Sequence, residues 1–279
     1  MEKTSDEAVQ DMNISIVTPS FNQACFIQAA IESVRGQGYP RFEHIILDNC
    51  STDGTVDLFK KYPHLNWVSQ PDQGQSDALN SGFRKAAGEV IGWLNADDRY
   101  LDGCFNKVAE FFSAHPHVDV LYGDYRLVNE KGEILQWRRE LNFDSFMLKY
   151  LHVLCVPSTT VFFRRRIFDE GNFLDTSYHY SMDYEFFLRL VKKGYKFAHL
   201  NEFLADFRWH ETSKSSRAVE KQRAELKKAQ MEHDSFLKSV HPRLRPVMRF
   251  FLMVLARGKR CFLKGIRGFY FSQWVRGAQ

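Results

Sequence analysis

The pattern of apolar and polar residues alternates between strand-like and helix-like segments over the first 115 residues. Short apolar runs at 14–17, 42–47, 65–69 and 90–94 are typical of buried strands. Between them, apolar residues recur at helical spacing over 24–35, 56–62 and 77–87. Strands that alternate with helices of this length predict an α/β fold with a mostly parallel central sheet flanked by helices.

The second half of the chain continues with less regular alternation. We expect helices at 104–114, 143–151 and 182–193 and a charged helix at 216–239, strands at 118–122 and 157–163, and a hairpin over 125–137. Residues 195–204 have a mixed pattern that favours neither state. The sequence contains no internal repeat and no low-complexity segment.

Polar residues follow the predicted strands at the point where each strand ends. Thr18, Asp48, Gln73 and Asp97 occupy these positions, so a parallel sheet brings them to one edge, where α/β proteins bind ligands. After the fourth strand the chain reads Asn95-Ala96-Asp97-Asp98. Two adjacent carboxylates repel each other unless a cation or proton lies between them, and their hard oxygens suit Mg²⁺ or Mn²⁺, which also holds a diphosphate. The alternative is an acidic turn after a strand.

Six motifs in this order resemble the family 2 glycosyltransferases, which have the GT-A (Rossmann-like) fold. The resemblance covers roughly residues 13–215. The motifs are Val17-Thr18-Pro19-Ser20-Phe21-Asn22, Asp48-Asn49-Cys50-Ser51-Thr52-Asp53-Gly54-Thr55, Gln73-Gly74-Gln75-Ser76-Asp77-Ala78-Leu79-Asn80, Trp93-Leu94-Asn95-Ala96-Asp97-Asp98, Met182-Asp183-Tyr184-Glu185 and Phe207-Arg208-Trp209-His210.

The resemblance implies a donor site for a nucleotide-sugar, most simply a UDP-sugar. It implies that Thr18, Pro19 and Asp48 form the pocket for the nucleotide base, where Asp48 accepts a hydrogen bond from a base N–H. Gln73 lies near the loop for the donor diphosphate and the acceptor. Without the resemblance, Asp48 is equally a turn or helix-capping carboxylate.

The family's D-x-D position is occupied here by Asn95, Ala96 and Asp97. Asn95 departs from the family pattern, in which many members have an aspartate at this position. Its amide can still bond a ribose hydroxyl, but binding of Mn²⁺ or Mg²⁺ then depends on Asp97. The resemblance implies that His210 is a second metal or diphosphate ligand, although a lone histidine beside a tryptophan is as often a packed loop residue. Asp98 either assists or caps the next segment. Arg208 and Lys214 either pair with the diphosphate or lie solvated.

The family's catalytic base matches Asp183. The preceding residue is Met182, where the family usually has a glutamate, so a helper carboxylate is missing. Glu185 is the rival base, and both acids also suit the positive N-terminal end of a helix. The resemblance implies inversion: the base takes a proton from the acceptor hydroxyl as that hydroxyl attacks the anomeric carbon, and no covalent nucleophile is needed. The acceptor implied is a saccharide or a lipid-linked saccharide.

Two other function classes stay open. A sugar nucleotidyltransferase has a Gly- and Arg-rich loop after its first strand, which the segment 18–22 lacks. A non-catalytic glycan- or nucleotide-binding scaffold remains compatible with Met182 and Asn95. A dinucleotide oxidoreductase is not expected, because no G-x-G-x-x-G follows a strand.

Charge is distributed unevenly along the 279 residues, whose net charge is +4. All 34 acidic residues lie before residue 235, whereas residues 235–279 contain ten Lys or Arg. Basic residues interleave with Phe, Leu and Trp over 243–276, which suits a helix with a basic and an apolar face lying on an anionic membrane surface. The alternative is a helix packed on the domain or on a partner subunit, as in a homo-oligomer. Nucleic acid is not expected, since no binding motif is present.

These features predict three segments: a flexible leader at 1–12, the GT-A domain at 13–215 and a helical, basic-amphipathic extension at 216–279. The five cysteines are scattered without a C-x-x-C pair, which favours reduced thiols. The N-terminus lacks signal-peptide features, and no apolar run approaches the ~20 residues of a membrane span. We therefore expect a cytoplasmic protein that is peripheral on the inner membrane face and acts in envelope polysaccharide synthesis.

Overall fold

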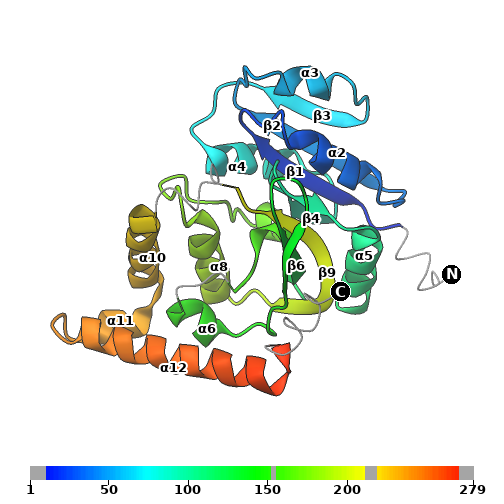
Figure 1. Cartoon of the computed structure of the whole chain (residues 1–279). Coiled ribbons are helices and arrows are strands. Elements are labelled where there is room, and N and C mark those ends of the chain that lie inside the picture. Colours follow the sequence, from blue (N-terminus) through cyan, green and yellow to red (C-terminus); the bar gives the residue numbers. More distant parts are fainter. Residues whose placement is uncertain (1–10, 152–154, 211–218, 270–279) are drawn as a thin grey trace.

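The predicted parallel strands form one side of a nine-stranded sheet (Figure 1). Strand β1 (Ile14–Ser20) pairs in parallel with β2 (Phe42–Asp48) and with β4 (Val90–Trp93), and β2 pairs in parallel with β3 (Leu65–Ser69). The helices α2 (Ile27–Arg35), α3 (Thr55–Phe59) and α4 (Gln75–Lys85) connect them. The computed structural model describes residues 11–151, 155–210 and 219–269.

The other side of the sheet is mixed. Strand β8 (Phe162–Arg164) lies antiparallel between β4 and β6 (Val120–Val128), and β9 (Phe197–Arg208) is parallel to β6 and antiparallel to β5 (Arg99–Tyr100). The strand β7 (Ile134–Arg138) completes the predicted hairpin with β6. The resulting order is β3-β2-β1-β4-β8-β6-β9-β5. The α/β fold is therefore confirmed: the pairs among β1 to β4 are parallel, and in the rest of the sheet the β6–β9 pair is parallel and the others are antiparallel.

Two apolar layers cover the two faces of the sheet. Neighbouring residues of a strand point to opposite faces, so Val17 belongs to the cluster under α4 and α8 (Met182–Lys193), whereas Ile16 belongs to the cluster under α2 and α5 (Cys104–Ala114). Both α5 and α8 begin and end as predicted. The predicted strand at 157–163 is wrong at its start: residues 158–160 form a 3₁₀ turn, because Thr160 N and Val161 N bond back to Pro157 O and Ser158 O. The short helix α7 (Arg166–Asp169) follows β8.

The single helix predicted at 216–239 is two helices, α10 (Val219–His233) and α11 (Ser235–Ser239). The break lies at Asp234, whose extended backbone ends α10 and whose carboxylate caps α11 by accepting from Phe236 N at 2.9 Å and Leu237 N at 3.2 Å. In Figure 1, α10 lies beside α8, and α12 (Arg245–Ile266) runs along the outside of the molecule under α6 (Ser145–Tyr150). Both α10 and α12 thus pack on the domain.

Several predicted features lie outside the described residues: residues 1–10 of the leader, Lys214, the domain boundary at 215 and the end of the tail from 270. The last two leader residues are described and are held in place: Met12 is buried, and Asp11 pairs with Arg41 at 2.8 Å. Among the helices of the described ranges, none has the length and apolar character needed to cross a membrane.

Candidate active site

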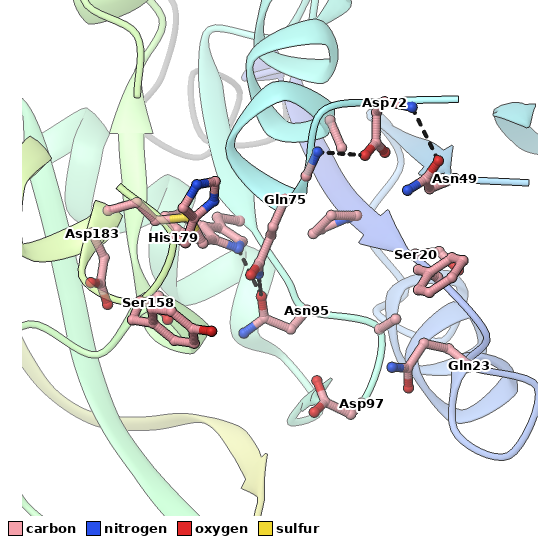
Figure 2. Close-up of a pocket in the computed structure, with 18 of the residues that line it drawn as sticks. Ser20, Gln23, Asn49, Asp72, Gln75, Asn95, Asp97, Ser158, His179 and Asp183 are labelled. Carbon is pink, nitrogen blue, oxygen red and sulfur yellow. Dashed lines mark hydrogen bonds between the residues drawn. The ribbon is translucent and has the colours of Figure 1, made fainter. Parts of the chain in front are cut away.

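A cavity of about 550 Å³ opens where the carboxyl ends of β1 and β4 face the N-terminus of α8. Figure 2 shows Ser20, Gln23 and Asn49 on one side of it and Ser158, His179 and Asp183 on the other, with Asn95 and Asp97 between them. Six of the predicted site residues line the cavity: Pro19, Asn95, Ala96, Asp97, Asp183 and His210. Motifs far apart in the sequence therefore meet in one place.

Asp97 and His210 contact each other directly. His210 Nε2 lies 3.0 Å from Asp97 Oδ2; the histidine side chain is 4% exposed and the aspartate 23%. Strand pairing explains this meeting, because β5 starts immediately after Asp98 and pairs with the end of β9, which leads into His210. The ring centroid of Phe26 lies 4.9 Å from that of the His210 imidazole, so the two rings pack together.

The Asp97–His210 pair suits a divalent cation whose remaining coordination positions are filled by the substrate. It offers one carboxylate and one imidazole, and in the described part of the chain no group of three or more His, Cys, Asp or Glu could hold a metal ion. Mg²⁺ and Mn²⁺ are commonly held by one or two protein ligands, with the remaining positions taken by water and substrate phosphates. The softer imidazole favours Mn²⁺ over Mg²⁺.

The neighbouring acid, Asp98, is buried and faces away from the cavity. Its carboxylate accepts from Thr159 Oγ1 at 2.6 Å, from Arg208 N at 2.9 Å and from Asn95 Nδ2 at 3.1 Å. Burial, and then the charge of Asp97, raise the pKa of Asp98 to about 8 despite these three donors. Asp98 therefore ties the turn to β9, and Asp97 is the carboxylate of the motif that reaches the cavity.

Hydrogen bonds also fix the amide of Asn95. Its Oδ1 accepts from Trp93 Nε1 at 2.9 Å and from Gln75 Nε2 at 3.1 Å. Gln75 lines the cavity, whereas the predicted residue Gln73 is exposed and is not among the lining residues. The difference arises at Gly74, whose φ of 112° turns the chain into α4 so that Gln75 begins the helix at the cavity.

Two acids in the first turns of α8 have different surroundings. Asp183 lines the cavity. Glu185 is 2% exposed and bonds Arg189 Nε at 2.9 Å, Arg189 Nη2 at 3.0 Å and His233 Nε2 at 2.9 Å. Burial alone would raise the pKa of Glu185, but the hydrogen bonds and charges of His233 and Arg189 outweigh it and leave the pKa below its ordinary value. Glu185 thus anchors α8 in the domain.

The loop before Asp183 is held by α10, which the sequence did not link to the site. The carboxylate of Glu225 accepts from three successive backbone N–H groups, those of His179 at 3.0 Å, Tyr180 at 2.7 Å and Ser181 at 2.9 Å. Gln222, one turn earlier on α10, lines the cavity and donates from Nε2 to Tyr180 O at 3.3 Å. We call this contact the α10 clamp; it makes the C-terminal extension part of the site.

Two predicted base-pocket residues are buried beside the cavity. Thr18 is buried, and its Oγ1 lies 2.9 Å from His44 Nε2. Asp48 is 1% exposed and accepts from Ser51 N, Ser51 Oγ and Ser69 Oγ, which uses three of the roughly four acceptor positions of a carboxylate. In this region the cavity is lined by Pro19, Ser20, Phe21, Gln23 and Asn49.

Arg208 also lines the cavity, and its guanidinium donates to three backbone carbonyls. It donates from Nε to Asp97 O at 2.9 Å and from Nη1 to Asn129 O at 3.0 Å and Glu130 O at 2.7 Å. It therefore supports the Asp97 turn, whereas the predicted diphosphate contact of Lys214 lies outside the described residues.

Comparisons with known proteins agree on the class. The family model described as Glycosyl transferase family 2 matches residues 15–171. TuaG of Bacillus subtilis, a glycosyltransferase named for teichuronic acid biosynthesis, is 29% identical over 213 residues, covering 73% of this chain and 81% of TuaG.

Two solved structures share the fold. Residues 1–349 of S. aureus TarS, in complex with UDP-GlcNAc, superpose with a TM-score of 0.61 at 20% identity, covering 89% of this chain and 80% of that one. The mannosyltransferase PcManGT of Pyrobaculum calidifontis, in complex with GDP-Man and Mn²⁺, gives a TM-score of 0.61 at 17% identity, with coverages of 88% and 73%. At these identities the likeness concerns the fold alone.

Proposed function

The chain belongs to glycosyl transferase family 2, and from that premise we propose that it moves a sugar from a nucleotide-sugar to a hydroxyl group of a saccharide or lipid-linked saccharide, with inversion at the anomeric carbon. A UDP-sugar is the donor we propose first, with a GDP-sugar as the alternative, since TarS is bound to UDP-GlcNAc and PcManGT to GDP-Man. The name of TuaG supports a role in envelope polysaccharide synthesis.

One observation carries the proposal: a single cavity is lined both by Asp183 and by the Asp97–His210 pair. Figure 2 shows Asp183 on one side of this cavity and Asp97 apart from it. An inverting displacement needs a base beside the incoming hydroxyl and charge stabilisation beside the departing diphosphate, and these two places lie on opposite sides of the reacting carbon. The cavity offers both with room for a sugar between them.

The roles follow from the positions of the side chains. Asp183 would accept the proton of the acceptor hydroxyl. Asp97 and His210 would hold Mn²⁺ or Mg²⁺, which when bound neutralises charge on the leaving diphosphate. Trp93 and Gln75 fix the side chain of Asn95 by hydrogen bonds to its Oδ1, and the amide of Asn95 would face the nucleotide-sugar. The backbone at Ala96 would lie against the same nucleotide-sugar.

The nucleotide base would lie against Pro19, with Asp48 contributing through its remaining acceptor position. Thr18 would act indirectly, through the wall it forms with His44. We assign to Gln75, which lines the cavity, the donor-side role that the sequence predicted for Gln73.

We also propose that the enzyme works in the cytoplasm at the inner face of the membrane, beside lipid-linked acceptors, and that its C-terminal extension provides the attachment. A homo-oligomer formed through the same extension is the competing arrangement.

The test is release of nucleoside diphosphate from a panel of UDP-, GDP- and dTDP-sugars, with Mn²⁺, Mg²⁺ or EDTA. We expect slow, metal-dependent hydrolysis of one donor, lost in Asp97→Asn and kept in the control Asp102→Asn, an exposed acid five residues later. Asp183→Asn should bind that donor with unchanged affinity and lose transfer.

Two results would replace the proposal. Donor binding without turnover under any of these conditions, with Asp183→Asn indistinguishable from wild type, would support a non-catalytic binding protein. Release of pyrophosphate from a nucleoside triphosphate and a sugar phosphate would support a sugar nucleotidyltransferase.

A further inference from the structure

We propose that the outward face of α12 docks this protein onto the surface of an anionic lipid bilayer, lying in the interface without crossing it. This face would be the surface that binds the membrane partner named above. The reason for such an attachment, access to a lipid-linked acceptor, rests on the proposed function.

The inner face of α12 is fully used by the domain. Ala256 is completely buried, and Met248, Leu252 and Leu263 pack in one cluster with residues of α6 and α11. Lys264, buried to 93%, donates from Nζ to Arg139 O at 2.8 Å, and Arg260 Nη2 lies 3.4 Å from Glu140 Oε2. The helix is therefore fixed to the domain by one face.

The opposite face is apolar and exposed. Exposed fractions reach 67% at Val247, 67% at Phe262 and 68% at Ile266. Nine of the thirteen large hydrophobic side chains that are exposed in the described ranges lie between Phe236 and Ile266, so exposed apolar surface is concentrated here. The residues that define the outer face of α12 are Val247, Phe250, Phe251, Val254, Leu255, Phe262 and Ile266.

Their spacing makes this face continuous. Steps of three or four residues keep side chains on one side of a helix, and such steps lead from Val247 through Phe250 and Val254 to Gly258, Phe262 and Ile266. With a rise of about 1.5 Å per residue, the 22-residue helix is about 33 Å long. Figure 1 shows α12 along the outside of the molecule, where a flat surface can reach its length.

Basic residues lie at the edges of this face and on the inner face. This corrects the sequence prediction, in which basic residues occupied the face opposite to the apolar one. At about 100° per residue, Arg257 borders the outer face on one side and Lys259 on the other; both are exposed, and Lys259 also contacts Asp144. The apolar stripe with basic edges is typical of helices that lie in a membrane interface, with lysine and arginine at the level of anionic headgroups.

Charge favours a bilayer over a second copy of the chain. Residues 235–279 contain no acidic residue, so two copies that meet through this face would bring their basic edges together, and Asp144, the acid that Lys259 contacts, is already paired. An anionic bilayer complements the basic edges and accepts the apolar side chains between them.

The test is flotation of the full-length protein with vesicles of phosphatidylcholine, with and without phosphatidylglycerol. We expect binding to the anionic vesicles and at least tenfold weaker binding to neutral ones. A triple variant with Phe250→Ser, Phe251→Ser and Phe262→Ser should have a vesicle partition coefficient at least tenfold lower than that of the wild type. The matched control is Ile134→Ser with Leu135→Ser, which removes exposed apolar side chains of β7 and should stay within twofold of wild type.

Each of three outcomes would overturn the proposal: no binding of the wild type to anionic vesicles, equal losses in the triple variant and the control, or a wild-type dimer that the triple variant converts to a monomer. Unchanged thermal unfolding of the triple variant shows that its loss is not a folding defect. Donor hydrolysis in solution separates the two proposals, because it depends on the cavity and should be equal in wild type and triple variant. Failure of flotation with hydrolysis intact would refute the docking face alone.

Discussion

Replacing Glu225 by glutamine tests whether the α10 clamp positions the proposed base. Glu225 accepts three backbone N–H groups from residues 179–181, and α8 with Asp183 starts directly after them. In the variant, one carboxylate oxygen becomes an NH₂ group that faces these donors. We expect the loop to lose its fixed orientation and kcat to fall, because the base is then aligned with the acceptor for a smaller fraction of the time.

The size of the effect can be estimated from the hydrogen bonds. A hydrogen bond to a charged group contributes about 1.5–3 kcal/mol, and the glutamine retains one acceptor oxygen. If that oxygen keeps the contacts with Tyr180 and Ser181, a single bond, the one to His179, is lost. If the loss of this bond destabilises the aligned orientation of the loop by about 1.5–3 kcal/mol, kcat should fall roughly 10- to 100-fold, at 1.36 kcal/mol per factor of ten. Glu225 is partly exposed, so the lower half of this range is expected.

The assay measures initial rates of nucleoside diphosphate release and reports kcat and KM separately. The donor KM should stay within about twofold, since the donor side of the cavity belongs to other elements. Glu220→Gln is the matched control, with the same change in charge at an exposed position of α10. The decisive measurement is the same replacement of Glu225 in an Asp183→Asn background, where misalignment of an absent base should lower the residual rate by less than about threefold.

Two results would refute this reasoning. One is an unchanged kcat in Glu225→Gln. The other is an equal loss in both backgrounds, because a purely structural effect of Glu225 would add independently of Asp183.

Three further changes test how the sheet supports the site. Gly82→Ala should destabilise the fold by more than about 2 kcal/mol, because its new Cβ would lie 2.3 Å from Val17 Cγ1; a control, Gly103→Asn, should cost less, and equal urea midpoints would contradict this. Burial, and then the charge of His64, lower the pKa of His44 to about 3, below its ordinary 6.5, so acidification protonates the unfolded chain first. The wild type should therefore lose about 2 kcal/mol more than His44→Gln between pH 7.5 and 5, and equal losses in urea titrations would exclude this cause. Asp206→Asn should cost about 3 kcal/mol or more, because this buried carboxylate pairs with two arginines at 2.6 and 2.5 Å, and an unchanged thermal midpoint would argue against it.

Segments whose pattern is local could be predicted from the sequence. The helices α5 and α8 have apolar residues at helical spacing and clear ends, and both have the predicted bounds. The long strand β9 was missed, because half of it is only partly buried and its partner β6 lies about 80 residues earlier. The antiparallel insertion of β8 between β4 and β6 also depends on pairing between distant segments, which no local pattern encodes.

The sequence alone determined which residue types reach the site and from which motifs. The alternation of strands and helices placed the ends of β1 and β4 at one edge of the sheet, and the motif order indicated a family 2 glycosyltransferase. These conclusions hold without coordinates because they depend on spacing along the chain.

Only the tertiary structure decided which polar side chains face the cavity. Asp97 and Asp98 are neighbours in sequence, yet Asp97 meets His210 at the cavity, whereas Asp98 is buried and accepts from Arg208 N, because it immediately precedes β5 and its pairing with β9. The role of Glu225 was equally hidden, since its helix is charged throughout and meets the loop before Asp183 across more than 40 residues of chain. Side-chain direction and long-range contact are set by packing, and packing is what the sequence pattern does not specify.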